Sequence, residues 1–177
     1  MEIFSIFFIG IGLSMDAFSL SLCYSALNLN RKKIIAIALS VGIFHFFMPL
    51  IGMFVGNFAK IFILPDIRIV VYTIFMLLGV EMIYESAKKE ENIYLTSFVG
   101  IVMFSFFVSI DSFSAGIGIN FITSKYILCS FIFSLTSSCF TYVGLNIGKV
   151  IAKRSEKLSK IIGGLIFILF ALYYLFR

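Results

Sequence analysis

Two aspartates lie inside otherwise apolar stretches, and they are the residues of this chain best suited to chemistry. Asp16 falls about halfway along a hydrophobic run that begins at Ile3, and Asp111 falls somewhat past halfway along another run. Placing an aspartate at the centre of a membrane costs roughly 2.5–3.5 kcal/mol, and a second carboxylate nearby adds repulsion unless a proton or a cation intervenes. The pattern therefore predicts a positive ligand that both acids share.

Serine oxygens accompany each aspartate. Ser14 and Ser109 precede their acids by two residues, so their hydroxyl or backbone oxygens are candidates for the same coordination shell. Manganese, magnesium and calcium prefer carboxylate, carbonyl and water oxygens, whereas copper(I) and zinc sites commonly recruit thiolates. The three cysteines form no paired motif, which favours a hard divalent cation. The alternative is that both aspartates are protonated and only hydrogen-bond between helices.

His45 and Glu81 are further candidate ligands. His45 is the only histidine, and it shares a glycine-rich helical face, where it can bind a cation, accept a proton or hydrogen-bond to another helix. Glu81 lies deeper in its apolar run than Glu85, and we expect it to help load cations from the cytoplasm. Glu85 precedes Lys88 and Lys89 at a spacing that favours ordinary ion pairing.

The composition indicates that membrane helices position these residues. Of the 177 residues, 61% are hydrophobic and 13% are charged, and the mean hydropathy is +1.11. A water-soluble fold could not bury so much apolar surface, whereas a spanning helix needs roughly 20 apolar residues. We expect one all-α, polytopic membrane domain over residues 1–177, with six transmembrane helices at 3–27, 34–58, 69–87, 94–122, 127–150 and 161–176.

The basic residues predict the orientation of these helices. Ten Lys and Arg residues fall in or beside the first, third and fifth connections, against four on the opposite side. Because cytoplasmic loops are enriched in positive charge, we expect loops one, three and five in the cytoplasm and both termini outside. Orientation thus accounts for the net charge of +5, and no nucleic-acid partner is expected.

The two halves of the chain resemble each other. Residues 14–19 (SMDAFS) match residues 109–114 (SIDSFS) at an offset of 95, and five positions of the second span recur as small or polar residues in the fifth at an offset of 92. A unit of three helices enters the membrane from the opposite side when repeated, so we expect inverted repeats at about 1–90 and 91–177, with the substrate site between them. Taken alone, the glycines also fit simple helix packing. The paired positions are Gly42 and Ser134, His45 and Ser137, Pro49 and Thr141, Gly52 and Gly144, and Gly56 and Gly148.

Motifs spread over most of the chain carry a family resemblance. They are residues 12–18 (GLSMDAF), 48–53 (MPLIGM), 82–85 (MIYE), 109–112 (SIDS) and 116–118 (GIG). Together they resemble the MntP-type manganese efflux pumps, within the lysine-exporter-like superfamily of small membrane exporters. The resemblance implies a bacterial inner-membrane protein that exports Mn²⁺, with Asp16 and Asp111 essential. The chain departs from the family pattern at His45, where a glutamate is usual, so the identity of the third ligand stays open.

These observations lead to a hypothesis of secondary export. Mn²⁺ enters from the cytoplasm near Glu81, replaces protons or partner cations on Asp16 and Asp111, and leaves after the two halves rock. The sequence contains no G-x-x-x-x-G-K-[ST] loop, so the energy comes from an ion gradient or from the manganese gradient and the membrane potential. The expected partners are the lipid bilayer, a divalent cation and a proton or other counter-ion. Manganese is the transported substrate, and no cofactor is expected.

Two other functional classes also fit part of the sequence. An intramembrane aspartyl protease also needs two aspartates, but such enzymes resemble one another through a G-x-G-D motif that this chain lacks. We therefore expect no enzyme activity. The remaining alternatives are an exporter of another divalent cation and a non-transport membrane component, such as a sporulation-associated relative.

Overall fold

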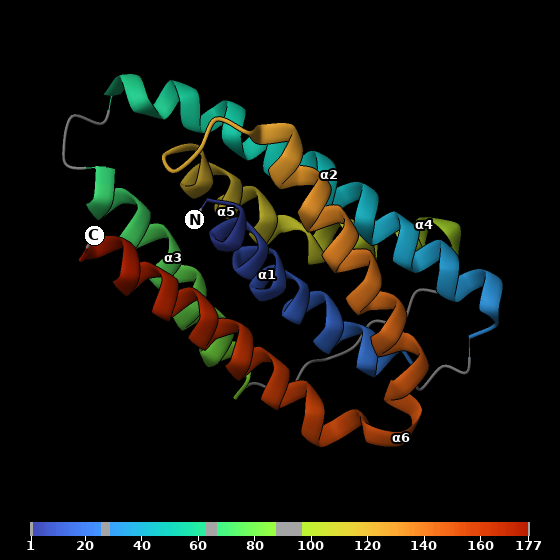
Figure 1. Cartoon of the computed structure of the whole chain (residues 1–177). Helices are drawn as coiled ribbons and strands as arrows, with labels where there is room; N and C mark the ends of the chain where they lie inside the picture. Colours follow the sequence, from blue (N-terminus) through green and yellow to red (C-terminus); the bar gives the residue numbers. More distant parts are fainter. Residues whose placement is uncertain (1, 26–28, 63–66, 88–96, 177) are drawn as a thin grey trace.

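The chain folds into helices throughout its described parts. The computed structural model describes residues 2–25, 29–62, 67–87 and 97–176, and these contain no strand. Helices satisfy their own backbone groups, which long apolar segments need where water is absent. The helices are α1 (Glu2–Tyr24), α2 (Arg31–Phe62), α3 (Ile67–Glu85), α4 (Phe98–Val108), α5 (Ile110–Asn120) and α6 (Tyr126–Leu175), arranged as an elongated bundle (Figure 1).

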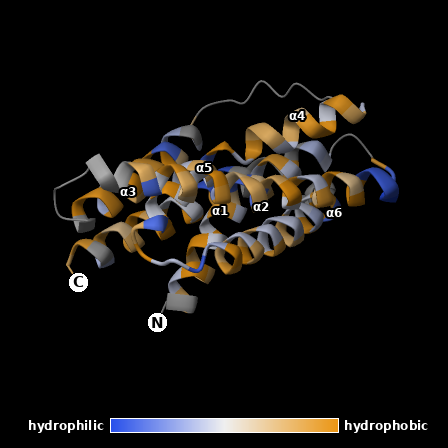
Figure 2. Cartoon of the chain, turned by 90° about the horizontal axis from the view of Figure 1, so that it is seen from above, coloured by the Kyte–Doolittle hydropathy of each residue, from blue (hydrophilic) through white to orange (hydrophobic). Residues whose placement is uncertain are grey.

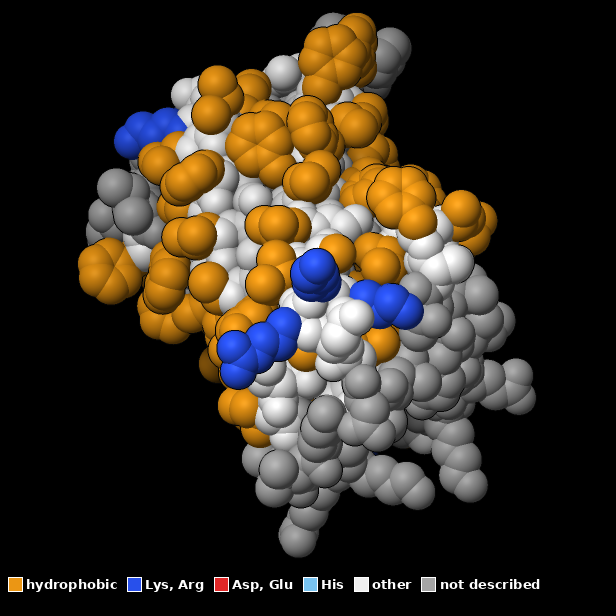
Figure 3. All heavy atoms as spheres, turned by 90° about the vertical axis from the view of Figure 1, so that its right-hand side faces the viewer, with side chains coloured by type: hydrophobic (Ala, Val, Ile, Leu, Met, Phe, Trp, Pro, Cys, Tyr) orange, Lys and Arg blue, Asp and Glu red, His pale blue; other side chains and the backbone are white. Residues whose placement is uncertain are grey.

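Within the described parts of the chain, four helical segments are long and apolar enough to cross a membrane, which makes this a multi-pass membrane protein. Two shorter apolar segments fall where the third and sixth spans were predicted, at Ile69–Tyr84 and Lys160–Tyr173. Hydrophobic residues extend along most of the helix lengths (Figure 2), and they cover most of the described surface on one face, where a few Lys and Arg side chains also lie (Figure 3). The long segments are Phe4–Leu22, Arg31–Phe58, Phe98–Asn120 and Tyr126–Ile147.

Helix α6 contains both of the last two predicted spans and turns back on itself. Gly10 and Gly12 are close neighbours on α1, yet Gly10 packs against Phe133 and Gly12 packs against Phe167. In a straight helix, Phe133 and Phe167 would be about 50 Å apart at 1.5 Å per residue. The ribbon of α6 accordingly doubles back (Figure 1). The predicted connection at 151–160 is helical, because its sequence (IAKRSEKLSK) contains strong helix formers and no Gly or Pro.

The span predicted at 94–122 is interrupted at Ser109, and its residues 94–96 lie outside the described part. Ser109 separates α4 from α5, with φ −102° and ψ 4°. Its backbone N–H donates to the carbonyl oxygen of Phe106 at 3.1 Å, and its hydroxyl donates to the carbonyl of Ser105 at 2.6 Å. Back-bonding by a serine hydroxyl is a known cause of helix bending. The break places the first turn of α5 inside the span rather than at its end.

Small residues bring the helices of the bundle close together. A Cβ atom at Gly52 on α2 would collide with the carbonyl oxygen of Phe113 on α5, and one at Gly144 on α6 would collide with Ser21 and lie 3.0 Å from the carbonyl oxygen of Phe18 on α1. Close backbone approach of this kind is how membrane helices gain packing contacts in the absence of a strong hydrophobic drive. Glycine at these positions therefore sets the distance between the helices.

We predict that Gly52→Ala destabilises the protein by about 1–3 kcal/mol, because the added methyl group meets backbone that cannot rotate away. The matched control is Gly10→Ala, whose methyl group would have as its nearest neighbours side-chain atoms of Phe133, Thr136 and Ile132, at 3.1, 3.2 and 3.5 Å. Thermal unfolding of both purified variants in detergent measures the difference. Equal melting temperatures for the two variants would contradict the assigned α2–α5 contact.

Candidate cation site

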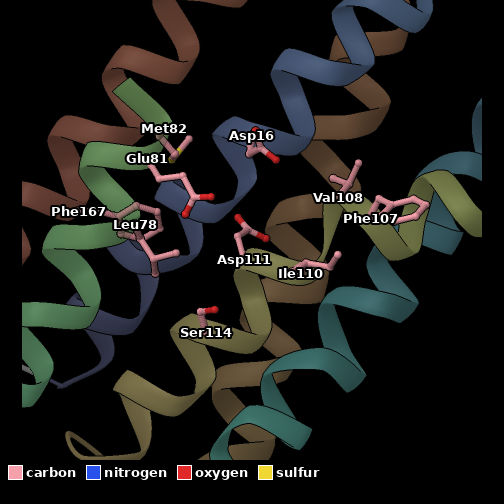
Figure 4. A pocket seen from close by; sticks show the side chains of 10 residues that line it. All are labelled: Asp16, Leu78, Glu81, Met82, Phe107, Val108, Ile110, Asp111, Ser114 and Phe167. Atoms are coloured by element: carbon pink, nitrogen blue, oxygen red, sulfur yellow. The ribbon is translucent and has the colours of Figure 1, made fainter. Parts of the chain in front are cut away.

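Three acidic side chains from three helices line one cavity. Asp16 comes from α1, Glu81 from α3 and Asp111 from α5, and their carboxylates extend toward a common space (Figure 4). The cavity measures about 310 Å³, which is room for a divalent cation with several waters, since each water occupies roughly 30 Å³. The other lining residues are Leu78, Met82, Phe107, Val108, Ile110, Ser114 and Phe167.

Asp111 is held at the beginning of a helix. One of its carboxylate oxygens, Oδ1, accepts the backbone N–H of Ser112 at 2.6 Å and the Ser112 hydroxyl at 3.4 Å. The other oxygen, Oδ2, is buried and has no hydrogen-bond partner among the described residues. The first turn of a helix carries partial positive charge, which stabilises a carboxylate there. The break at Ser109 therefore supplies this acid with a favourable field while leaving Oδ2 available.

The three acids interact electrostatically. Asp111 lies within the electrostatic reach of both Asp16 and Glu81. Asp16 and Asp111 are half-buried, whereas Glu81 is exposed at the side of the cavity. Like charges in a medium of low dielectric repel strongly. The arrangement therefore favours a positive species inside the cavity.

The cavity is open and does not contain a compact metal cluster. Among the described His, Cys, Asp and Glu side chains, no group of three or more is gathered closely enough to hold a metal ion by itself. A cation in this cavity would thus keep some water ligands, or the helices would have to move closer around it. Oxygen-rich sites for hard cations commonly retain water.

Ser14, Ser109 and His45 do not line the cavity. The hydroxyl of Ser14 donates to the carbonyl of Gly10 at 2.6 Å and lies 3.2 Å from the hydroxyl of Ser137. The hydroxyl of Ser109 lies 2.9 Å from Nδ1 of His45, which is also 3.0 Å from the carbonyl oxygen of Val41. The structure thus brings Asp16, Glu81 and Asp111 together and places both serines and His45 in hydrogen-bonded contacts outside the cavity.

A second cavity of about 290 Å³ shares part of its lining with the first. Leu78, Glu81 and Ser114 belong to both cavities, so Glu81 and Ser114 stand at their junction. Ser114 stands three residues after Asp111, which puts both residues on one helical face. The apolar lining residues gave no signal in sequence, because they resemble every other apolar residue of the chain. The rest of the second lining is Ile74, Leu77 and Ile117.

Comparison with known proteins identifies the family. The family described as "Putative manganese efflux pump" matches residues 28–175. A relative from Geobacillus thermodenitrificans, named "Putative manganese efflux pump MntP", is 33% identical over 99% of this chain and 96% of its own length. A relative of the same name from Bacillus cereus (strain ATCC 10987) is 34% identical over 93% of this chain and 91% of its own length. No solved structure matches the chain. With an all-helical membrane fold and similarity along nearly its whole length, the chain belongs to the MntP family of manganese efflux pumps.

Proposed function

We propose that this protein exports Mn²⁺ from the bacterial cytoplasm by secondary transport, using Asp16, Asp111 and Glu81 as its cation site. The observation that carries the proposal is the single cavity lined by acids from three helices. The names of the relatives support manganese as the substrate. The oxygen-only character of the charged lining also fits manganese, which prefers hard ligands.

The proposed architecture has six membrane crossings in two inverted repeats, residues 1–90 and 91–177, within one domain. The positions of the helix ends support this crossing pattern (Figure 1). One end of the bundle holds the start of α1, the end of α2, the start of α3 and the end of α6. The other end holds the starts of α2 and α4 and the turn within α6. Paired positions also make paired contacts. Gly52 packs on the carbonyl of Phe113, and Gly144 packs on the carbonyl of Phe18.

The proposed orientation places both termini outside and the basic connections in the cytoplasm of a plasma-membrane protein. In this orientation, Phe107 lies toward the cytoplasmic end of the first cavity, and Ile74 and Ile117 lie toward the outside in the second cavity. The cation passes from the cytoplasm to the three acids, and Glu81 lies at the junction of the inner and outer parts of this route. A relative movement of the repeats then opens the outer part.

Charge balance determines the chemical role of each acid. Protons or other counter-ions occupy the carboxylates when manganese is absent, and Mn²⁺ displaces them. Oδ2 of Asp111 is oriented for this exchange because its companion oxygen is already held by Ser112. Residual water on the ion fills the positions that the protein leaves open, and this lets the ion depart without breaking a complete protein shell.

We predict that Asp16→Asn and Asp111→Asn each lower manganese transport at least tenfold, because each variant removes a negative ligand from the cavity. The measurement is Mn²⁺ flux in proteoliposomes containing purified protein. Cys139→Ser is the control, since Cys139 is exposed and distant in sequence from both acids. Normal flux in both aspartate variants would contradict the proposed site.

Glu81→Gln is predicted to act more mildly than either aspartate variant. Glu81 is exposed at the junction of the cavities, and a solvated charge attracts cations less strongly than a buried one. We expect the KM for Mn²⁺ to rise several-fold at low ionic strength, with a smaller change in maximal rate. Because exposed charges are screened by salt, the difference from wild type should shrink at high ionic strength. An effect independent of salt would argue against a role in attraction.

Cysteine labelling tests the orientation. In a background lacking the three native cysteines, each variant carries a single exposed thiol. Lys32→Cys places it in the first turn of α2, and Lys125→Cys places it just before α6. We predict that a membrane-impermeant maleimide added to intact cells labels the cysteine at position 125 and not the one at position 32. Labelling of both after the membrane is opened is the control. The same accessibility for both from outside would contradict the proposed crossing pattern.

A further inference from the structure

Two hydrogen bonds connect the halves of the molecule directly behind the aspartates. Ser109, two residues before Asp111, contacts His45 on α2 at 2.9 Å, and Ser14, two residues before Asp16, contacts Ser137 on α6 at 3.2 Å. We propose that His45 and Ser137 are equivalent positioning residues, each holding the aspartate-bearing helix of the opposite half. The inference rests on the proposed function, since it concerns how the cation site is held in shape.

The direction of both hydrogen bonds follows from the number of available protons. The Ser109 hydroxyl has one proton, which it donates to the carbonyl of Ser105 at 2.6 Å, so it can only accept from His45. Nδ1 of His45 must then carry a hydrogen, which also suits its 3.0 Å contact with the Val41 carbonyl. This assigns the neutral ring as the Nδ1–H tautomer.

The same reasoning applies to the first half. Ser14 donates its proton to the carbonyl of Gly10 at 2.6 Å, so it accepts from the hydroxyl of Ser137. The four side chains of these two contacts, Ser14, Ser109, His45 and Ser137, are fully buried. A buried hydrogen bond that loses its donor leaves an acceptor without water to replace it. Each contact therefore has an energetic reason to persist.

The register of the repeats makes the two contacts counterparts. Gly10, Ser14 and Asp16 stand 95 residues before Ser105, Ser109 and Asp111, whereas His45 stands 92 residues before Ser137. The aspartate helix and its partner helix thus follow different offsets, yet the same serine meets the same partner position in each half. Local sequence on one helix cannot produce this agreement. It requires that each half contacts the other in the same way.

The two contacts differ in the backbone around them. Pro49 has no N–H, so the carbonyl of His45, four residues earlier, lacks its helical hydrogen-bond donor. At the equivalent position, four residues after Ser137, the chain has Thr141, which keeps its N–H. The helix is interrupted at Ser109, between α4 and α5, but α1 continues without interruption through Ser14. His45 therefore supports the interrupted α4–α5 segment. We expect its loss to have a larger effect than the loss of Ser137.

Substitutions at His45 separate positioning from direct ligation. Asparagine carries its amide N–H at the same bond distance from the backbone as Nδ1, so His45→Asn keeps the donor while removing the imidazole. His45→Ala removes both. If His45 acts through Ser109, the asparagine variant retains near-wild-type affinity for Mn²⁺ and the alanine variant does not. If the ring binds the cation through Nε2, both variants lose affinity for Mn²⁺.

The experiment measures Mn²⁺ flux against Mn²⁺ concentration in proteoliposomes containing the full-length chain. We expect His45→Ala to raise the KM roughly five- to tenfold, as is typical for the loss of one buried hydrogen bond, with a smaller fall in maximal rate. His45→Asn should stay within about twofold of wild type on the same argument. Ser137→Ala should fall between them. Ser25→Ala is the matched control, because the hydroxyl of Ser25 is also buried and donates to the carbonyl of Leu22 at 2.6 Å.

A double-mutant cycle with Ser109→Ala tests the hydrogen bond itself. If the two residues act through one bond, His45→Ala combined with Ser109→Ala has a KM close to that of either single variant. Additive effects, or equal loss in His45→Asn and His45→Ala, would overturn the inference. Size-exclusion profiles identify any variant that fails to fold, and the asparagine variant then decides the outcome. Absence of Mn²⁺ flux in the wild type would instead refute the proposed function.

Discussion

The repulsion between carboxylates inside an apolar bundle is the constraint on which the rest of the structure depends. A central aspartate costs roughly 2.5–3.5 kcal/mol in a membrane, and here two aspartates and a glutamate line one cavity. The structure offsets part of this cost without neutralising it. The first turn of α5 stabilises Asp111, and the open side of the cavity leaves Glu81 exposed. The remaining cost would be offset by a proton or a cation on these acids.

The close helix crossings follow from the same constraint, because each acid must be held in place by its neighbours. Phe18 and Phe113 lie two residues after Asp16 and Asp111, and the backbone carbonyl of each packs on a glycine of the opposite half. The serines two residues before the acids accept hydrogen bonds from the opposite half. Each aspartate is therefore fixed on both sides along its helix. Because the two acids belong to different halves, a shift of one half relative to the other would change the distance between them.

The sequence predicts much of the helical structure and little of its irregularity. Long apolar runs indicate the helices clearly, and the four longest form segments of spanning length. The break at Ser109 could not be predicted, since residues 14–19 and 109–114 are similar and only the second motif is interrupted. The two motifs differ in their tertiary contacts, since Ser109 meets an imidazole and Ser14 meets a hydroxyl. The sequence predicts a connection at 151–160 but not its helical form, because charged residues are typical of loops as well as of solvated helices.

The candidate site was predictable to a similar degree. Repeat symmetry indicated that Asp16 and Asp111 belong together, and the structure places both at one cavity with Glu81. Their roles as ligands stay predictions. The positions of Ser14, Ser109 and His45 depended on rotation about helix axes, which a short motif does not specify. The hydroxyls of Ser14 and Ser109 and Nδ1 of His45 are used in hydrogen bonds between and within helices, whereas Nε2 of His45 is buried without a hydrogen-bond partner among the described residues.

An open site suits transport better than a closed one. A shell of three carboxylates tight around Mn²⁺ would hold the ion strongly, whereas transport requires binding that is favourable on entry and weak enough for release. The described acids share a cavity without forming a compact cluster, so water would complete the shell of an ion bound in this arrangement. Small movements of the helices can then change the number of protein ligands. The hydrogen bonds between the halves, rather than the ligands alone, would in this way determine how tightly the ion is held.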